Sequence, residues 1–432
     1  MRRRLLLIAY RFDPDFSMES RLAWRRAETA ATEFDVTVLC ALSGDPAVLQ
    51  VPAGCEVLQV PHDRREQALA ALPTGGQWAN ARWQRRAYAV AAEADRTRPF
   101  DLVHHVSYCG YRQPSECWRL GKPYLWGPVG GVHNFPWRFL TAIEPLGAVR
   151  EISRNLLNAL QLRHSRRVSR ASSAATMTLA ANRQAAKELR RAGRPIAGVM
   201  LETGIDAVRP TPRVPRDPDK PLRILWAGRA CSWKGLPLLL RALAAARTEA
   251  SFTLRVMSAG PQLAQWRRLT QRLGLDDCVE WVGWPGYEGR QPHYDWADVF
   301  AFTSLRDTSG TGLLESLAAG APIIGFDHQG AADVLAEDCA LRIPVATPRK
   351  AVANFREGVI ALARDAERLA RLSRGALERA RDFLWSDQGA RLRMAYAACL
   401  DDGANSAAAQ PLHPPYPAKF RATSSPAASA AG

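Results

Sequence analysis

The sequence lacks any apolar run approaching the ~18 residues that a membrane-spanning helix needs. The longest run near the start, Leu5–Tyr10, follows three arginines and is followed at once by Arg11. It is too short for the apolar core of a signal peptide, so we expect it to form a buried first strand.

Cysteine pairs are also missing. The eight cysteines stand singly, and none forms a Cys-x-x-Cys pair. This argues against zinc ribbons and redox motifs and predicts reduced thiols in a cytoplasmic setting. By contrast, 47 % of the 432 residues are apolar. That share excludes a wholly disordered chain, and the length allows two or three domains with cores of their own.

Acidic residues are scarce in the first half of the chain. The net charge is +16, and residues 1–200 hold 29 Lys/Arg against 17 Asp/Glu. A basic surface of this kind indicates a polyanionic neighbour, either nucleic acid or an anionic membrane. In Arg150–Arg170 leucines alternate with arginines. An amphipathic helix that lies on a membrane has this pattern, and so does a solvated helix face.

Short buried strands alternate with helices along most of the chain, which predicts an α/β fold with parallel sheets covered on both faces. Residues 209–221 contain five prolines, which break regular structure and mark a linker. We therefore expect two Rossmann-like, doubly wound domains, residues 1–208 and 222–385, that face a central cleft. Ligands bind at the carboxyl ends of the strands in such sheets. Residues 401–432, rich in Ala, Pro and Ser, are expected to be disordered.

The first loop that carries chemistry is 227–235, which follows an expected strand and opens a helix. Gly228 allows a tight backbone turn. Arg229 and Lys234 place two cations five residues apart. A helix start with two cations suits a diphosphate, although the same residues could form a solvated surface loop.

The second loop lies within 307–322, where a glycine-rich turn opens a short helix that stops before a proline. Gly310 and Gly312 expose backbone N–H groups at the helix N-terminus, which suits an anion. Glu315, one turn into the helix, can accept hydrogen bonds from a vicinal diol such as that of ribose. Asp307 can hold sugar hydroxyls. The alternative is a glycine turn with a capping carboxylate.

In combination, the Gly-Arg…Lys-Gly loop at 228–235 and the acid-x7-Glu pair of Asp307 and Glu315 resemble the retaining glycosyltransferases of family 4 (glycosyl transferases group 1), which have the GT-B fold. The resemblance covers most of residues 3–400 and is most specific at 222–247 and 296–335.

Smaller matches extend the resemblance. Asp206 matches the Asn-Gly-Val-Asp that closes the first domain in that family, and Gly330 and Asp333 match its Gly-x-x-Glu loop. Residues 383–386 resemble the point where the last helix returns to the first domain. The resemblance thus implies that 386–400 form a helix crossing back.

The resemblance also implies roles. Arg229, Lys234 and Asp307 would be the catalytic residues, with the two cations neutralising the departing diphosphate in place of a metal, and no cofactor would be needed. The implied donor site comprises Gly228, Gly283, Gly310, Thr311, Gly312, Leu314 and Glu315, with backbone groups near Gly283 recognising the base. Asp13-Pro-Asp15 and Asp217-Pro-Asp219 imitate a metal-binding Asp-x-Asp motif, and we interpret them as turns.

The sequence departs from the family pattern in three places. Asp307 is one methylene shorter than the usual Glu. Residues 17–20 replace a Gly-Gly-x-Glu loop and retain only Glu19, and residues 126–131 carry no histidine where the family often has one. The histidine near the reacting carbon is therefore left open among His104, His105, His133 and His328. Additional candidate site residues are Glu19, His105, Gly130 and His328.

These patterns predict an enzyme at the inner face of the cell membrane, cytoplasmic and peripherally bound. It would transfer a sugar from a nucleotide-diphosphate sugar to a lipid-linked saccharide in surface polysaccharide biosynthesis. One alternative is a sugar-nucleotide 2-epimerase or a phosphorylase on the same fold. A phosphorylase needs a pyridoxal-binding lysine, and the chain has only six lysines. Another alternative is nucleic-acid binding through 150–194. It leaves Asp307 and Glu315 unexplained, so no nucleic-acid partner is expected.

Overall fold

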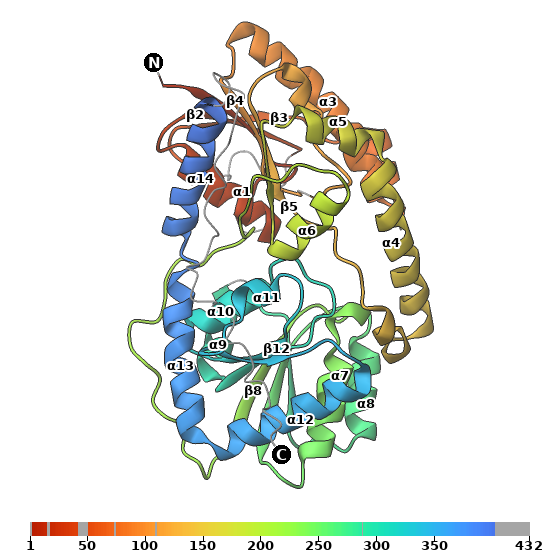
Figure 1. The fold of residues 1–432 in the computed structure, drawn as a ribbon, viewed down its shortest axis with the longest axis vertical. Helices are drawn as coiled ribbons and strands as arrows, with labels where there is room; N and C mark the ends of the chain where they lie inside the picture. Colours follow the sequence, from red (N-terminus) through yellow and green to blue (C-terminus); the bar gives the residue numbers. More distant parts are fainter. Residues whose placement is uncertain are drawn as a thin grey trace, which may run out of the picture.

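The computed structural model describes residues 2–14, 18–41, 51–72, 75–108, 110–286 and 288–401. Within these ranges the chain forms two α/β units, one above the other in Figure 1, each built on its own parallel sheet. The expected fold class is therefore confirmed. Apart from Asp401, the tail predicted at 401–432 lies outside the described residues.

The N-terminal domain has a seven-stranded sheet in the order β3-β2-β1-β4-β5-β6-β7, and every strand pair is parallel. Its strands are β1 (Arg4–Ile8), β2 (Asp35–Cys40), β3 (Cys55–Gln59), β4 (Leu102–His105), β5 (Tyr124–Val129), β6 (Met177–Ala180) and β7 (Gly198–Val199). Its helices are α1 (Met18–Ala30), α2 (Arg64–Ala70), α3 (Gly76–Thr97), η1 (Cys117–Leu120), η2 (Trp137–Ala142), α4 (Pro145–His164), α5 (Arg166–Ala174) and α6 (Arg183–Arg191).

The C-terminal domain has a six-stranded parallel sheet in the order β10-β9-β8-β11-β12-β13. Its strands are β8 (Leu222–Ala227), β9 (Phe252–Met257), β10 (Val279–Gly283), β11 (Val299–Phe302), β12 (Ile323–Phe326) and β13 (Ala340–Ile343). Its helices are η3 (Ser232–Lys234), α7 (Leu236–Ala246), α8 (Leu263–Arg272), η4 (Glu288–Arg290), α9 (Gln291–Trp296), α10 (Thr311–Ala318), α11 (Ala331–Val334), α12 (Pro348–Arg364) and α13 (Ala366–Arg381), followed by α14 (Trp385–Asp401).

Strand β1, in the middle of its sheet, is buried on both faces because helices cover both sides of the sheet. In β1 all five residues are buried. Leu6 and Ile8 belong to one core cluster, and Leu5 and Leu7 belong to another on the opposite side. Side chains alternate across a strand, so a continuous apolar run of this kind serves two cores at once.

The last helix, α14, returns to the N-terminal domain and packs on α1, β4 and β5. Figure 1 shows it continuing the line of α13 past the boundary between the domains. A short parallel bridge ties this crossing to residues 200–206, because Ile205 donates to the carbonyl of Phe383 (3.0 Å) and Trp385 donates to the carbonyl of Ile205 (3.0 Å).

Loops that follow the strands of one sheet meet loops that follow the strands of the other. Asn182 lies just beyond β6, and its side chain donates to the carbonyl of Thr308, which lies beyond β11 (2.7 Å). Arg183 donates to Asp333, beyond β12 (2.6 Å). The carboxyl ends of both sheets therefore face the same region between the domains, as the sequence predicts for a cleft.

We expect Tyr396→Phe to weaken the contact of α14 with the first domain. The Tyr396 hydroxyl lies 2.8 Å from Nδ1 of His104, and both side chains are fully buried. Removing the hydroxyl leaves a buried imidazole nitrogen unpaired, which costs about 1–3 kcal/mol in the free energy of unfolding. Urea denaturation measures the difference.

Tyr88→Phe is the matched control, because the Tyr88 hydroxyl has no hydrogen bond to the described part of the chain. Equal effects of the two substitutions would contradict the role assigned to the Tyr396 hydroxyl.

Candidate active site

The two loops singled out in the sequence lie against each other because β8 and β11 are neighbours in the sheet. Leu305 N–H donates to the carbonyl of Trp233 (2.8 Å), and the Thr303 hydroxyl donates to the carbonyl of Lys234 (2.7 Å). Gly235 has φ +65°, and a Cβ there would lie 2.4 Å from the carbonyl oxygen of Thr303. The close approach of these loops thus requires glycine at 235.

An ion pair between Lys234 and Asp307 joins the loops at their tips. Burial alone would raise the pKa of Asp307. The ammonium of Lys234 and hydrogen bonds from Ser304 and the Thr308 N–H outweigh burial, and they hold the pKa of this carboxyl below its usual range. Asp307 is therefore an ionised carboxylate that orients the Lys234 cation.

Arg229 is the second cation of the first loop, and its environment differs from that of Lys234. Its side chain is exposed and makes no ion pair with another described residue. Its loop is fixed by the backbone, since Gly228 N–H donates to the carbonyl of Met257 (3.1 Å) and Ser258 Oγ donates to that of Gly228 (2.7 Å). Arg229 therefore has no described role in holding the fold.

Glu315, on α10, has one oxygen engaged and one free. Its Oε1 lies 3.2 Å from Arg290, whereas its Oε2 is buried and has no hydrogen-bond partner among the described residues. A buried carboxylate oxygen without a donor is costly and indicates a site for a donor group from a ligand. Arg290 in turn lies 6.0 Å from the indole centroid of Trp284, which is half exposed.

The remaining candidate donor residues surround α10 and β10. Gly310, with φ +66°, is the N-cap of α10 and leads into Thr311 at its first position. Gly312 packs near Tyr294 Oη, and Leu314 is fully buried in the core. Gly283 ends β10 with φ +74°, and its carbonyl accepts the Ser258 N–H (2.6 Å). Thus Leu314 supports the helix from beneath, while the glycines form the turns at the strand ends.

A cavity of about 310 Å³ lies on the N-terminal side of the second loop. It is lined by Glu19, Leu22, Arg26, Val106, Ser107, Tyr108, Gly110, Pro128, Gly130, Gly131, Glu202 and Thr308. Gly130 lies so close to Glu202 of its own domain and to Thr308 of the other that a Cβ on it would be 2.8 Å from Glu202 Oε1 and from Thr308 Cγ2. Two of the additional candidates, Glu19 and Gly130, therefore line one cavity with Thr308 of the second loop.

Glu202 is a cavity residue that sequence reasoning missed. Its Oε2 accepts a hydrogen bond from Ser309 Oγ (2.7 Å), across the domain boundary. Burial raises the pKa of Glu202 to about 7, although the hydrogen bond from Ser309 and the charge of Arg26 act in the opposite direction. The only sequence signal was its position just before the Gly204–Asp206 match.

Two further side chains, Arg306 and Gln329, clamp the second loop and its neighbour to the N-terminal domain. Arg306 makes a two-point ion pair with Glu151 of α4 (3.1 and 3.0 Å). Gln329 bridges the domains by accepting the Asp307 N–H (2.8 Å) and donating to the carbonyl of Asn134 (2.9 Å). These residues were also missed, because no local spacing connects partners more than 100 positions apart.

Two residues matched to the family make structural ion pairs. Asp333 is buried and binds Arg183 through the backbone N–H (2.7 Å) and the guanidinium. Asp206 lies at the surface and pairs with Arg21 and Arg25 of α1. Gly330 packs so closely on the carbonyl of Thr308 that a side chain there would overlap it.

The candidate histidines fall into two groups, one packed within the N-terminal domain and one near the second loop. His104 bonds to Tyr396 and to the carbonyl of Gly127, and His105 accepts the Ser115 N–H (3.3 Å), so both are packed within the N-terminal domain. His133 Nε2 lies 2.8 Å from Asn182 Nδ2, and Asn182 also contacts the second loop.

His133 and His328 flank residues that contact Asp307 through Gln329, since Gln329 accepts the Asp307 N–H and donates to the carbonyl of Asn134. Burial lowers the pKa of His133 to about 3 and that of His328 to about 4, so both rings are neutral at physiological pH. The ring of His328 acts on the pKa of His133 in the same direction as burial, and the carboxylate of Asp307 acts against it, so the three groups share one electrostatic neighbourhood.

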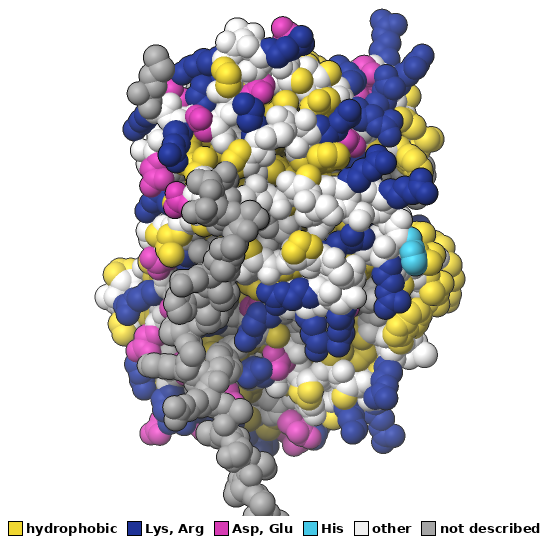
Figure 2. All heavy atoms as spheres, turned by 45° about the horizontal axis from the view of Figure 1, so that its top comes forward, with side chains coloured by type: hydrophobic (Ala, Val, Ile, Leu, Met, Phe, Trp, Pro, Cys, Tyr) yellow, Lys and Arg dark blue, Asp and Glu magenta, His cyan; other side chains and the backbone are white. Residues whose placement is uncertain are grey.

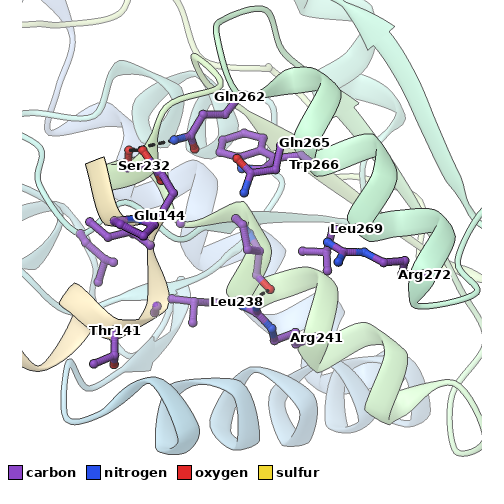
Figure 3. Close-up of a pocket in the computed structure, with 16 residues that line it drawn as sticks. Thr141, Glu144, Ser232, Leu238, Arg241, Gln262, Gln265, Trp266, Leu269 and Arg272 are labelled. Carbon is purple, nitrogen blue, oxygen red and sulfur yellow. Dashed lines mark hydrogen bonds between the residues drawn. The ribbon is translucent and has the colours of Figure 1, made fainter. Parts of the chain in front are cut away.

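A second pocket, of about 250 Å³, lies behind the first loop between η2 and helices α7 and α8 (Figure 3). Figure 3 shows Glu144, Ser232 and Gln262 on one side and Arg241 and Arg272 on another. Ser232 Oγ donates to Glu144 Oε1 (2.6 Å) and accepts from Gln262 Nε2 (3.0 Å). The start of α4 is thus tied to the loop that carries Lys234.

No group of three His, Cys, Asp or Glu side chains in the described part of the chain is arranged to hold a metal ion. Asp13 and the 217–219 turn belong to no such group. Within the 217–219 turn, Asp219 N–H donates to Asp217 Oδ1 (3.1 Å), a local turn hydrogen bond. Asp15 lies outside the described residues.

We expect Glu202→Gln to change how stability depends on pH. A carboxyl whose pKa rises from 4.5 when unfolded to about 7 when folded loses stability as pH increases through that window. Glutamine keeps the acceptor for Ser309 without the buried charge, so the variant should be more stable than wild type above pH 7, by about 3 kcal/mol.

Thermal denaturation of both proteins between pH 4 and 8 measures this, and the difference should vanish at the acidic end. Glu378→Gln, at an exposed position of α13, is the control. Its difference in melting temperature from wild type should not change with pH. A Glu202→Gln difference that did not change with pH would contradict the assignment.

Comparison with known proteins agrees with this geometry. Residues 221–365 match the family model described as glycosyl transferases group 1. The chain is 28 % identical over 142 residues to the "Putative colanic acid biosynthesis glycosyltransferase WcaL" of Escherichia coli strain K12, a match that covers 31 % of this chain and 35 % of that protein. The chain therefore spans about a third of the length of the curated relatives it matches.

Solved structures match over nearly the whole chain. The sucrose-phosphate synthase of Thermosynechococcus elongatus aligns with a TM-score of 0.68 at 18 % identity, covering 93 % of this chain and all of that one. Anabaena HepE in complex with UDP-glucose aligns with a TM-score of 0.59 at 15 % identity, covering 91 % and 99 %. At these identities the likeness concerns architecture, and the architecture is GT-B, with a glycosyl transferases group 1 match in its C-terminal domain.

Proposed function

We propose that this chain is a retaining glycosyltransferase of family 4 that moves a sugar from a nucleotide-diphosphate sugar to a hydroxyl group. One observation carries the proposal. An exposed cation, Arg229, and a paired cation, Lys234, lie on one loop, and α10, which follows the neighbouring strand β11, carries Glu315 with a buried Oε2 that has no partner among the described residues. The match of residues 221–365 to glycosyl transferases group 1 supports it.

Charge stabilisation of the leaving group is assigned to the two cations. When the bond to the sugar breaks, negative charge develops on the diphosphate. Fixed positive groups that are already in position stabilise that charge without a metal ion or cofactor. Asp307 keeps the Lys234 ammonium in place, as their ion pair indicates. Gly310 and the first N–H groups of α10 provide further donors.

Nucleoside recognition is assigned to the side of the sheet that ends in β10. Glu315 Oε2 accepts the ribose hydroxyls, and backbone groups after Gly283 and the exposed indole of Trp284 receive the base. UDP is the first nucleotide to test, because HepE of the same architecture is described in complex with UDP and UDP-glucose.

The acceptor is assigned to the cavity between Glu19, Gly130 and Glu202, which opens beside Thr308 on the N-terminal side. We propose a lipid-linked saccharide of surface polysaccharide biosynthesis as acceptor and a cytoplasmic, peripheral position on the inner face of the membrane. Relatives named for colanic acid and amylovoran biosynthesis support the polysaccharide assignment. None of the described helices has the length and apolar character to cross a bilayer.

Calorimetric titration with UDP, GDP and ADP in the presence of EDTA tests the donor site. Wild type should bind one of the three, and Glu315→Ala should weaken that binding at least tenfold, because hydrogen bonds to a charged group contribute about 1.5–3 kcal/mol. Glu337→Ala, at an exposed position of the same domain, is the control.

A folded protein that bound none of the nucleotides, or a Glu315→Ala variant with unchanged affinity, would overturn the donor-site assignment. Binding that disappeared in EDTA would overturn the metal-free part alone. Binding followed by conversion of the donor without transfer to any acceptor would favour the 2-epimerase.

Arg229→Met tests the assignment of the leaving-group cation. We expect release of the nucleotide from its sugar to slow on the order of 10²–10³-fold in kcat, as removal of one transition-state donor does in other sites. The melting temperature should stay unchanged, since Arg229 makes no described ion pair. Arg241→Met, exposed on α7, is the control. An equal effect of both substitutions would contradict the assignment.

A further inference from the structure

Helix α4 has its polar face buried and its apolar face exposed. Its buried positions are Gly147, Glu151, Asn155, Asn158 and Leu162, which recur at intervals of three and four and therefore share one side of the helix. Large apolar side chains occupy the opposite side and are 50–60 % exposed: Leu146, Val149, Leu156, Leu157 and Leu160. This is the reverse of a surface helix in a globular protein.

The orientation of α4 is fixed by hydrogen bonds on its inner side. Glu151 makes the two-point pair with Arg306. The Asn155 amide bonds both to the N–H and to the carbonyl of Phe135 (2.9 Å each), and Asn158 accepts the Tyr111 hydroxyl (2.8 Å). Rotating the helix to bury its leucines would break all of these buried bonds, so the leucines are held outward.

The surroundings of this apolar ridge, defined here as the five exposed side chains of α4, are basic. Arg150, Arg163 and Arg166 are exposed on or beside α4. The acidic residues of this stretch, Glu144 and Glu151, are engaged by Ser232 and Arg306. Figure 2 shows hydrophobic side chains gathered at the right-hand edge, where α4 runs in Figure 1, with Lys and Arg side chains beside them.

We propose that the apolar ridge of α4 inserts into the surface of an anionic membrane, with the flanking arginines on the lipid headgroups. An apolar face bordered by arginines suits this occupant, because leucines gain by leaving water while cations are attracted to anionic lipid. A soluble protein that bound the apolar ridge would not explain why arginines border it. The proposal deepens the peripheral location proposed above by naming the surface, and it does not depend on the sugar chemistry.

Co-sedimentation of the full chain with vesicles tests the proposal. Wild type should bind vesicles of phosphatidylcholine mixed with phosphatidylglycerol and bind phosphatidylcholine alone much more weakly. The triple variant Leu156→Gln, Leu157→Gln, Leu160→Gln should lose at least tenfold in partitioning, because each leucine contributes apolar area to insertion. These positions are exposed and Gln is a good helix former, so folding should be kept.

The control is the pair Leu72→Gln and Met394→Gln, exposed apolar residues on other elements, which should bind as wild type does. Replacing Arg150, Arg163 and Arg166 by Gln should weaken binding to the anionic vesicles and reduce its dependence on salt. Arg371→Gln and Arg374→Gln, exposed on α13, are the charge control.

Failure of wild type to bind the anionic vesicles, or equal binding by the ridge variant, would overturn the proposal. So would a wild-type dimer in sedimentation velocity that the ridge substitutions dissociate, because the occupant would then be a second copy. Vesicle binding requires no nucleotide, so the two experiments test the two proposals separately. A chain that fails to bind vesicles can still bind a nucleotide, and a chain that fails to bind a nucleotide can still bind vesicles.

Discussion

The structure depends on the requirement that buried charged and polar groups be paired. Residues 303–309 satisfy this requirement through contacts with both domains. On the C-terminal side Asp307 holds Lys234. On the N-terminal side Arg306 meets Glu151, and Ser309 and Thr308 meet Glu202 and Asn182. An unpaired charge or an unsatisfied polar group at any of these positions would be costly. The loop is therefore the common point through which the candidate donor site, the cavity and α4 are positioned relative to one another.

The sequence predicts the fold well because its information is local. The buried run at β1, the alternation of strands and helices, and the prolines of 209–221 each depend on a few neighbouring residues. The placing of the C-terminal loops is predictable for the same reason, since Gly228, Arg229 and Lys234, like Gly310 and Glu315, lie at fixed spacings beside adjacent strands of one sheet. A short spacing in the chain there corresponds to a short distance in space.

The N-terminal half of the site could not be predicted in this way. Glu202 reaches Ser309 over 107 positions and Arg306 reaches Glu151 over 155, and no pattern in a single chain connects such partners. The histidines show the same limit. Spacing placed His104 and His105 at a strand end, and burial and the contacts with Tyr396 and Ser115 decide where they point. The leucine pattern of α4 was visible, but only the folded contacts of Asn155 and Asn158 show that its leucines face outward.

The bridge between Ile205 and Leu384 has a mechanical consequence. The chain passes from one domain to the other near residue 205 and returns near residue 384, and the bridge places both crossings side by side. A body joined to another by two adjacent strands can swing about the line through them, but it cannot twist or slide freely. Opening of the cleft is thereby confined to a single hinge axis along this edge.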